Sequence, residues 1–588
     1  MRVLLLLPLA LIAGGSFAQL NDGRTSFSRA DTLRGSIGPE RAWWDVRHYA
    51  VSVTPDLDQR TITGRTYIKF SAIAPGQRMQ IDLQQPLVVD SIHMWSSGTT
   101  PTPDGRYVGE TSIKIPVPFQ REGNVLWVDL PHAFQPEEGG TLWIDYHGTP
   151  RAARTPPWDG GWIWRKDAAG NPWVSVACQG LGASVWYPCK DHQSDEPEEG
   201  ATLRIIVPDS LQGIGNGRLR GTWPNGDGTT TWEWQVSSPI NTYNLIPYIG
   251  KYTHWSEDYV GVEGPLQCDY WVLAGNETKA RAHFQQVPAM LRCFEEWLGP
   301  YPFYRDGFKL VEAPHLGMEH QSAIAYGNNF MNGYRGRDLS GTGHGLDWDY
   351  IIIHESGHEW FGNSITTADI ADMWVHEGFT DYTETIFTEC QQGPAAAQEY
   401  LIGLRKNIRN DKPIIGPYGV NDEGSGDMYY KGANLLHMIR HIVGDSTFKS
   451  LLLDMDRTFR HSVVTSDQVE AFIIGYNATT RSLLHPSLFD QYLRSTKIPV
   501  LEHAFVKRRL WMRWTNAVPG LQLPVKVEVG GDTLFTPLST QWPLYSTSKK
   551  YRKSSRLKVD PAWYVGARKL SRREAKGLGD SAPPPGIK

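Results

Sequence analysis

Cysteine, an excess of either charge and long apolar runs are all scarce in this sequence. Five cysteines occur in 588 residues, and an odd count in so long a chain is not a disulfide framework. Cys178 and Cys189 are close enough in sequence to pair across a hairpin, and the alternative is that they are buried free thiols. The 58 basic and 63 acidic side chains leave a net charge of −5, which excludes a general nucleic-acid binder. Beyond the N-terminal segment no run is apolar and long enough for a stable membrane span.

Aromatic residues, in contrast, are abundant. The chain holds 23 Trp and 25 Tyr, and hydrophobic residues make up 40% of it. A disordered chain would be poorer in aromatic side chains, so we expect a globular protein. The length exceeds what one hydrophobic core can organise, and at roughly 150 residues per domain it predicts three or four domains.

The N-terminus has the pattern of a secretory signal peptide over residues 1–18. Arg2 precedes an almost wholly apolar run from Val3 to Ala13, and Ser16-Phe17-Ala18 resembles a small-x-small cleavage site. The run is short for a bilayer, although a membrane anchor or a buried first strand is the alternative. We therefore expect an exported protein, either periplasmic or extracellular.

Three zones of different character follow, and together they predict a multidomain α+β fold. Residues 19–258 read as a β domain, a sandwich or saddle-shaped sheet, because Tyr49, Val51 and Val53 alternate with polar neighbours. Residues 259–498 are mostly helical, and 499–576 return to alternation typical of a small β-sandwich, followed by a flexible tail at 577–588. Helices are predicted at 282–298 (kinked at Pro288), 350–363, 373–390, 429–443 and 467–476.

The segment from Ile351 to Glu384 carries the chemistry. It contains H-E-x-x-H as His354, Glu355 and His358. On a helix, the two histidines lie on one face one turn apart and can hold one metal ion. Glu355 is rotated away from that row, which suits a carboxylate that takes a proton from metal-bound water.

A catalytic zinc usually has three protein ligands and one open position, so a third ligand must come from elsewhere. Glu377, which opens the next helical stretch, is the best candidate. Glu384 lies two helical turns beyond it and could accept a hydrogen bond from a ligand histidine, while Thr366 is a weaker candidate for such support. The motif thus predicts one Zn²⁺ per chain. The alternative is a surface helix with two histidines and an intervening glutamate.

H-E-x-x-H followed after eighteen residues by E resembles the signature of the gluzincins. The runs 358–363 and 374–379 are similar to those of the aminopeptidase N family, which includes leukotriene hydrolase. The resemblance implies a β N-terminal domain, a thermolysin-like catalytic domain and a small β-sandwich. It covers nearly the whole mature chain and is strongest over 314–432. A helical fourth domain, present in many members, is expected to be absent.

The same resemblance implies how substrate is held. Leu316-Gly317-Met318-Glu319-His320 stands where the family has a G-x-M-E-N-like motif, in which the glutamate binds the substrate's free α-amine, with zinc ligand Glu377 sharing that contact. His320 departs from the family's asparagine. A carboxylate in a closed cleft is what an exopeptidase needs to recognise a cation near the scissile bond. Gln179, in a segment resembling one that leans over the family's active site, would help to hold the amine.

Tyr429-Tyr430-Lys431-Gly432 resembles the family's Y-x-K-G, in which the first tyrosine stabilises the oxyanion. The match favours Tyr429, and Tyr430 competes for the role. These residues predict an exported zinc aminopeptidase that acts on peptides with a free N-terminus, with Glu355 as general base. The rivals are an endopeptidase on the same core, an epoxide hydrolase, and a non-catalytic exported binding protein with an aromatic surface and a structural zinc.

Overall fold

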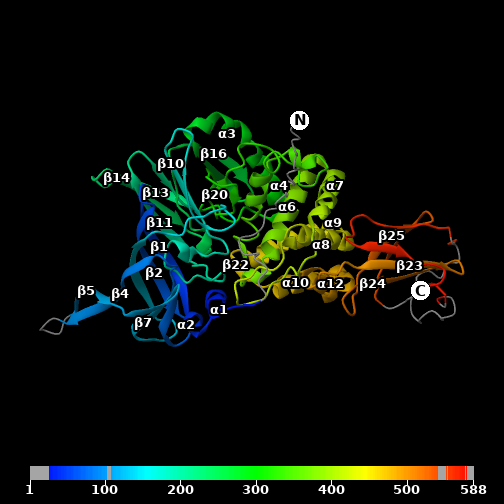
Figure 1. Cartoon of the computed structure of the whole chain (residues 1–588), viewed down its shortest axis with the longest axis horizontal. Helices are drawn as coiled ribbons and strands as arrows, with labels where there is room; N and C mark the ends of the chain where they lie inside the picture. The colour runs from blue at the N-terminus through cyan, green and yellow to red at the C-terminus, as the bar shows by residue number, and fades with distance from the viewer. Residues whose placement is uncertain (1–25, 102–106, 541–550, 553, 577, 579–588) are drawn as a thin grey trace, which may run out of the picture.

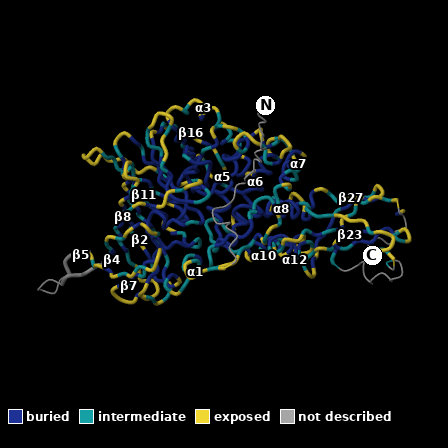
Figure 2. Tube along the Cα trace, viewed as in Figure 1, coloured by how far each residue is buried: buried dark blue, intermediate teal, exposed yellow. Residues whose placement is uncertain are grey.

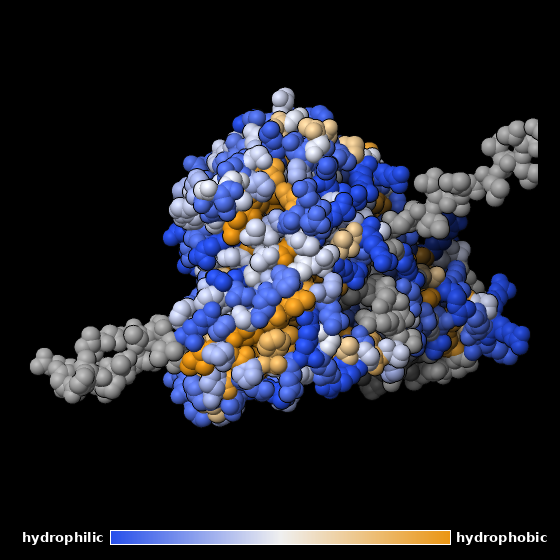
Figure 3. Space-filling view, turned by 60° about the vertical axis from the view of Figure 1, so that its left-hand side comes forward, coloured by the Kyte–Doolittle hydropathy of each residue, from blue (hydrophilic) through white to orange (hydrophobic). Residues whose placement is uncertain are grey.

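The computed structural model of the chain describes residues 26–101, 107–540, 551–552, 554–576 and 578. The predicted signal peptide, 1–18, lies outside these residues, as does nearly all of the predicted tail. The described part is a multidomain α+β protein, in which strands occupy both ends of the long axis and most of the helices lie between them (Figure 1). Figure 3 shows one face covered largely by hydrophilic residues, with hydrophobic ones gathered in a few patches.

The largest sheet has eight strands in the order β13-β14-β11-β1-β2-β8-β4-β5. β1 pairs in parallel with β11 and antiparallel with β2, and the alternation at Tyr49, Val51 and Val53 does bury these side chains. Strands β4 and β5 run out from the body as a long hairpin arm (Figure 1). The strands are β1 (Trp44–Asp56), β2 (Thr61–Ala72), β4 (Val88–Pro101), β5 (Tyr107–Pro116), β8 (Gly139–Gly148), β11 (Ala201–Pro208), β13 (Arg218–Pro224) and β14 (Thr229–Val236).

Two smaller sheets and two short helices complete this end of the molecule. One sheet has the order β3-β7-β6 and the other β12-β15-β10-β9. Their bounds are β3 (Gly76–Asp82), β6 (Phe119–Glu122), β7 (Val125–Phe134), β9 (Gly161–Lys166), β10 (Pro172–Ala177), β12 (Gln212–Ile214) and β15 (Tyr248–Gly250); the helices are α1 (Arg29–Gly35) and α2 (Pro39–Ala42). Helix α1 lies against the loop that contains Val420 and Asn421, so closely that a side chain at Gly35 would overlap their backbone.

A five-stranded sheet, in the order β16-β17-β18-β20-β19, lies between two apolar cores. Tyr270 and Val272 of β17 face the core formed with the helices, whereas Trp271 and Leu273 face the core of the N-terminal sheets. The predicted domain boundary at residue 258 falls inside β16. The strands are β16 (Tyr252–Gly261), β17 (Gly264–Leu273), β18 (Phe308–Glu312), β19 (Gly317–Met318) and β20 (Ile324–Tyr326).

The helices agree with the predicted ones in place but differ at their ends. The helix expected at 282–298 is two helices, and Pro288 does not kink the second, because it sits in the first turn, where no intrahelical N–H is needed. The helix expected at 350–363 ends at Gly357. The bounds are α3 (Glu277–His283), α4 (Gln286–Leu298), α5 (Tyr350–Gly357), α6 (Trp374–Gln392), α7 (Pro394–Leu404), α8 (Tyr430–Val443), α9 (Asp445–Phe459), α10 (Ser466–Gly475), α11 (Ala478–Leu483) and α12 (Pro486–Leu493).

The C-terminal strands form two three-stranded sheets, β24-β23-β28 and β26-β25-β27, and their apolar side chains join the core of the helices. Two very short strands, β21 (Ile365–Thr367) and β22 (Ser462–Val464), pair in parallel beside the helices. Buried residues gather around α5 and α6 (Figure 2). The C-terminal strands are β23 (Val500–Val506), β24 (Arg509–Thr515), β25 (Val525–Val529), β26 (Asp532–Thr536), β27 (Leu557–Val559) and β28 (Gly566–Lys569).

The cysteines pair differently from the hairpin considered above. Cys178 and Cys189 are buried free thiols, and the disulfide joins Cys293 of α4 to Cys390 of α6. Sequence distance misled, because the paired cysteines are 97 residues apart and are brought together only by the packing of two helices. Over the described residues, no helix combines the length and the apolarity needed to cross a bilayer.

Candidate active site

Helix α5 carries the first residues of the H-E-x-x-H motif into the interior. Its N-cap is Asp349, whose carboxylate accepts the backbone N–H groups of Ile351 and Ile352 at 2.8 and 3.3 Å. The other carboxylate oxygen accepts the phenol of Tyr326 at 2.8 Å. The apolar first turn is buried, so the helix is embedded in the core and its last turn presents His354 to a cavity.

Three side-chain atoms converge at the end of this helix. His354 Nε2 lies 3.3 Å from His358 Nε2, and Glu377 Oε2 lies 3.6 Å from the first and 3.3 Å from the second. In a tetrahedral zinc site with bonds of about 2.0–2.1 Å, ligand atoms are about 3.3–3.4 Å apart, so the spacing fits three of its corners. Within the described residues, the buried Glu377 Oε2 atom has no hydrogen-bond donor. Two imidazoles and a carboxylate therefore form a donor set suited to a metal ion.

The other ring nitrogens of these histidines are held by hydrogen bonds. His354 Nδ1 lies 2.8 Å from an oxygen of Glu384, whose second oxygen accepts the phenol of Tyr400 at 2.6 Å. His358 Nδ1 lies 2.9 Å from the Phe361 carbonyl oxygen. An acceptor at Nδ1 fixes the proton there and leaves Nε2 as the atom that can bind a metal.

Thr366 lies elsewhere than predicted, and that part of the prediction is corrected. Its hydroxyl donates to the carbonyl of Gly362, in the turn that separates α5 from α6. The hydroxyl beside His358 belongs to Thr380, whose Oγ1 lies 3.2 Å from Nδ1. Thr380 stands three residues after Glu377 on α6, so helical spacing from the third ligand was the signal that could have found it.

Glu355 points into the same cavity, next to β19. Burial raises the pKa of its carboxyl to about 8, with the charge of His354 opposing the rise and that of Glu319 reinforcing it. A Cβ at Gly317 would lie 2.6 Å from Glu355 Oε1. Glycine at position 317 is therefore what lets the carboxylate of Glu355 lie against the edge strand.

Glu319, just beyond β19, is buried and lies within metal-binding reach of Glu355 and His358. Gln179 and Tyr243 both donate to Glu319 Oε1, the tyrosine at 3.0 Å. Burial raises the pKa of Glu319, the charge of His358 opposing and that of Glu377 reinforcing. Sequence analysis missed Tyr243, which lies in a loop outside every motif.

The histidine at position 320, where the family has asparagine, leaves Glu319 among the residues that line the cavity. His320 Nδ1 lies 2.6 Å from the phenol oxygen of Tyr248, which itself donates to the Ala323 carbonyl at 2.7 Å. Burial, reinforced by the neighbouring His315, lowers the pKa of His320 well below its ordinary value. His320 is thus a buried neutral side chain next to Glu319.

The two adjacent tyrosines have different surroundings. Tyr429 is the N-cap of α8 and lines the cavity, with its ring stacked 6.1 Å from that of His354. Burial raises the pKa of Tyr429, and the charge of Glu377 adds to it. Tyr430 is packed under the neighbouring carboxylates of α6 and is not among the cavity-lining residues.

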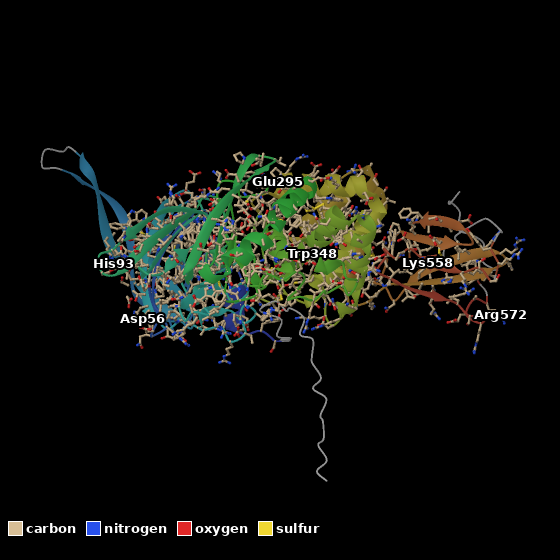
Figure 4. The ribbon with its side chains drawn as sticks, turned by 90° about the horizontal axis from the view of Figure 1, so that it is seen from above. Asp56, His93, Glu295, Trp348, Lys558 and Arg572 are labelled. Atoms are coloured by element: carbon tan, nitrogen blue, oxygen red, sulfur yellow. A yellow bond between two sulfur atoms is a disulfide. The ribbon has the colours of Figure 1, made fainter. Side chains whose placement is uncertain are left out.

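The cavity has a volume of about 80 Å³. Trp348, near the middle of the molecule in Figure 4, packs behind it on Tyr350, with ring centroids 6.4 Å apart. The cavity therefore lies deep inside the protein, where the two halves meet. The lining consists of Pro157, Trp158, Gln179, Leu316, Gly317, Met318, Glu319, Tyr334, Tyr350, Ile351, His354, Glu355, His358, Glu377 and Tyr429.

Comparison with known proteins gives consistent results. Human aminopeptidase B is 24% identical over 379 residues, which are 61% of this chain and 54% of the relative. Aminopeptidase N of Haemonchus contortus is 24% identical over 50% of this chain and 31% of the relative, and mouse endoplasmic reticulum aminopeptidase 1 is 21% identical over 76% and 48%. The chain thus spans about a third to a half of the length of these curated relatives.

Among solved structures, an M1 zinc metallopeptidase mutant of Deinococcus radiodurans bound to a Tyr-Ser-Ala substrate superposes with a TM-score of 0.63. It is 22% identical, and the match covers 79% of this chain and 98% of that one, so the two share a fold. The model of the peptidase family M1 domain matches residues 283–484, which include every cavity residue of α5, α6 and the edge strand. Residues 283–484 thus match the peptidase family M1 domain, and the chain is similar in sequence to aminopeptidases B and N.

Proposed function

We propose that this protein is a zinc-dependent aminopeptidase. The observation that carries the proposal is the position of Glu319: a buried carboxylate lines the same cavity as the His354, His358 and Glu377 donor set. A carboxylate there can hold a substrate ammonium at a fixed distance from the metal. The relatives named aminopeptidases support the same activity.

Zinc bound to His354, His358 and Glu377 would polarise the scissile carbonyl and acidify a water molecule. Glu355, which projects beside the ligand atoms, takes the proton from the attacking water and passes it to the leaving amine. The phenol of Tyr429 donates a hydrogen bond to the oxygen that becomes negative.

The free end of the peptide is held on the opposite side of the cavity. Glu319, oriented by Gln179 and Tyr243, binds the α-ammonium. The edge strand β19 places the backbone of Gly317 and Met318 alongside the first residue. Only the first peptide bond can then reach Glu355, so one residue is released in each cycle.

Replacing Glu355 by Gln tests the general base. The variant should keep about one zinc per chain, because residue 355 is not a ligand, while kcat on aminoacyl-aminomethylcoumarin substrates falls by about 10²–10⁴. Zinc content by mass spectrometry and kcat from fluorescence are measured on the same sample. Turnover close to that of the native protein would refute the assignment.

N-acetylated substrates test the exopeptidase assignment. The native protein should cleave a free peptide and leave its N-acetylated form intact, because acetylation removes the cation that Glu319 binds. Equal cleavage of both would indicate an endopeptidase. One zinc per chain with no hydrolysis of any substrate would indicate a binding protein.

We also propose that the protein is exported. The signal-like segment at 1–18 supports export, and so does the Cys293–Cys390 disulfide, since such bonds persist in oxidising compartments. Fractionation of expressing cells should place the mature chain, beginning at Gln19, outside the cytoplasm. A cytoplasmic product that keeps residues 1–18 would contradict this.

A further inference from the structure

Trp158 is a cavity residue that the chemistry above does not use. It lies on the loop between β8 and β9, and the loop is held in shape by Asp159, whose carboxylate accepts the backbone N–H groups of Arg154 and Thr155, both at 2.8 Å. The backbone N–H of Trp158 donates to the Thr155 carbonyl at 2.9 Å. Trp158 is therefore presented to the cavity by a fixed turn.

Sheet register places Trp158 on the amine-binding side of the cavity. Gly161, the first residue of β9, pairs with Ala177, the last residue of β10. Trp158 precedes this pair and Gln179 follows it, so the two side chains leave neighbouring strand ends. Because Gln179 donates to Glu319, Trp158 lies near the carboxylate that would hold the α-amine.

A second loop meets Trp158 from the catalytic side. Asn328 holds this loop, because its side-chain nitrogen donates to the Met331 and Gly333 carbonyls at 2.7 and 2.8 Å and its oxygen accepts the Arg335 N–H at 2.9 Å. The loop presents Tyr334 to the cavity.

The same loop is backbone-strained and reaches across to Trp158. Asn329 and Phe330 both have φ of 57°, and Arg335 has φ of 51°. Left-handed conformations in non-glycine residues concentrate at functional sites. The Arg335 guanidinium lies 5.8 Å from the Trp158 ring centroid. Trp158 and Tyr334 thus form a wall from two separate parts of the chain.

The size of the cavity limits what this wall can enclose. The cavity volume of about 80 Å³ corresponds to roughly three water molecules, at about 30 Å³ each in the liquid. That is close to the number of non-hydrogen atoms in a side chain from alanine to leucine. Phenylalanine, tyrosine, lysine and arginine residues are larger.

The charged groups that line the cavity also disfavour substrates whose first residue is acidic. The charged groups among the described lining residues are the carboxylates of Glu319, Glu355 and Glu377 and the two histidines. In the proposed mechanism Glu319 binds the substrate amine and Glu355 the attacking water. Glu377 and the two histidines bind the metal ion. The uncharged surfaces left for a side chain include those of Trp158, Tyr334 and Met318, and a carboxylate placed there would be desolvated close to other carboxylates.

We propose that Trp158, with Tyr334, forms the far wall of the first-residue pocket and restricts the substrates to peptides that begin with a small, uncharged residue, from alanine to leucine. The inference rests on the proposed aminopeptidase function and names its substrate class. A pocket that lacks room for extra methylene groups discriminates by about 10–200-fold for each one.

The test is a panel of alanyl-, leucyl-, phenylalanyl-, arginyl- and glutamyl-aminomethylcoumarin with the zinc-loaded full-length protein. The native protein should have its highest kcat/KM on the alanyl or leucyl substrate, with the other three lower by about tenfold or more. In Trp158→Ala, the phenylalanyl-to-alanyl ratio should rise by about tenfold or more, because the wall recedes. Trp158→Leu, which keeps an apolar side chain, should give an intermediate ratio.

Trp223→Ala is the matched control, because this tryptophan is 47% exposed on the outer strand β13. Its ratio should equal that of the native protein. A native preference for the arginyl, glutamyl or phenylalanyl substrate, or an unchanged ratio in both Trp158 variants, would overturn the pocket assignment while leaving the aminopeptidase proposal intact. Absence of all hydrolysis by a zinc-loaded native protein would overturn both.

Discussion

At the scale of single residues, Tyr429 and Tyr430 show how one position along the chain separates two environments. Tyr429 caps α8 and stacks near His354 in the cavity, whereas Tyr430, the first helical residue, is not among the cavity-lining residues. A phenol helps to stabilise a developing negative charge only when it faces that charge. The proposed oxyanion role therefore belongs to the first tyrosine.

Phenylalanine substitutions separate the two. Tyr429→Phe should lower kcat by about 10²–10³, the usual effect of losing one oxyanion donor, with little change in KM. Tyr430→Phe is its matched control and should stay within about threefold, since Tyr430 does not line the cavity. Steady-state kinetics on an alanyl substrate decides the matter, and a larger loss in the Tyr430 variant would reverse the assignment.

The convergence of the three predicted metal ligands could be expected from the sequence, because their spacing along the chain is local. His354, His358 and Glu377 lie on helical segments whose periodicity is legible, and the structure brings their donor atoms within 3.6 Å of one another. Tyr243 and Trp158 lie on loops from the N-terminal half. No periodic signal relates a loop residue to a cavity that is assembled by distant strands, so these two could not be predicted.

At the scale of elements, the contact between α6 and α8 sets the position of Tyr429. A Cβ at Gly432 would lie 3.0 Å from the Gly378 Cα atom, and a Cβ at Gly378 would lie 3.2 Å from the Gly432 Cα atom. The two glycines let the helices approach closely. Gly378 follows Glu377 directly, so the same contact positions the proposed metal ligand Glu377 and the cavity residue Tyr429.

Gly432→Ala should separate the helices by a few tenths of an ångström. We expect kcat to fall about tenfold, because small misplacements of reacting groups are costly, and the free energy of unfolding to fall by about 1–3 kcal/mol from overpacking. Kinetics and urea unfolding measure both. Gly475→Ala is the control, since a Cβ there meets nothing within 4 Å. Equal losses of kcat and stability in the two variants would contradict the inference that the close approach of α6 and α8 positions Tyr429.

The disulfide between α4 and α6 should stabilise the protein without assisting catalysis. Its cysteines are 97 residues apart, and closing a loop of that size is worth about 2–5 kcal/mol. Cys390 lies roughly 20 Å along α6 from Glu377, at 1.5 Å per residue.

The double variant Cys293→Ala, Cys390→Ala should therefore lose about 2–4 kcal/mol of unfolding free energy while keeping kcat and KM. Urea denaturation under oxidising and reducing conditions provides the comparison. Identical denaturation midpoints for the native protein in both conditions would show that the bond does not contribute.

Helix ends were less predictable than helix positions, for reasons visible in particular residues. The expected helix at 350–363 stops at Gly357 because the chain turns there to bring His358 and the Phe361 carbonyl together. The start of α10 was predictable, since Thr465 and Gln468 form a reciprocal capping box within four residues. Local hydrogen bonds can be read from sequence, and tertiary ones cannot.

At the scale of the whole molecule, a chain of three buried asparagines joins the N-terminal sheets to the catalytic part. Asn216 donates to the Asn244 carbonyl at 2.8 Å, Asn244 to the Asn363 side-chain oxygen at 2.7 Å, and Asn363 to the Glu319 carbonyl at 2.8 Å. The position of Glu319, the proposed amine-binding residue, thus depends on both halves.

Asn244→Ala should raise KM several-fold with a smaller effect on kcat, because Asn363 loses the donor that orients it and Glu319 loosens. The free energy of unfolding should fall by about 1–3 kcal/mol, the cost of a buried unsatisfied acceptor. Asn225→Ala, on an exposed hairpin, is the control. A kcat-dominated loss would indicate that the link acts on the metal site instead.

The division into sheet-rich and helical zones was predictable from alternation and helical periodicity. The residue at which one zone ends and the next begins was not predictable, because the two faces of the five-stranded sheet belong to different cores. Val311 faces the core of the N-terminal sheets, and Leu310 faces the core of the helices. Because β18 is buried along its whole length, it shows no alternation that would mark a boundary between the two cores.

The contact of Gly35 with Val420 and Asn421 bears on the order in which the molecule matures. Helix α1 is synthesised early, yet its seat is built by a loop roughly four hundred residues later, and joining such distant segments is slow. The helix that emerges first is therefore among the last to dock. Until then, helix α1 of a nascent or translocating chain is not packed against the rest of the molecule.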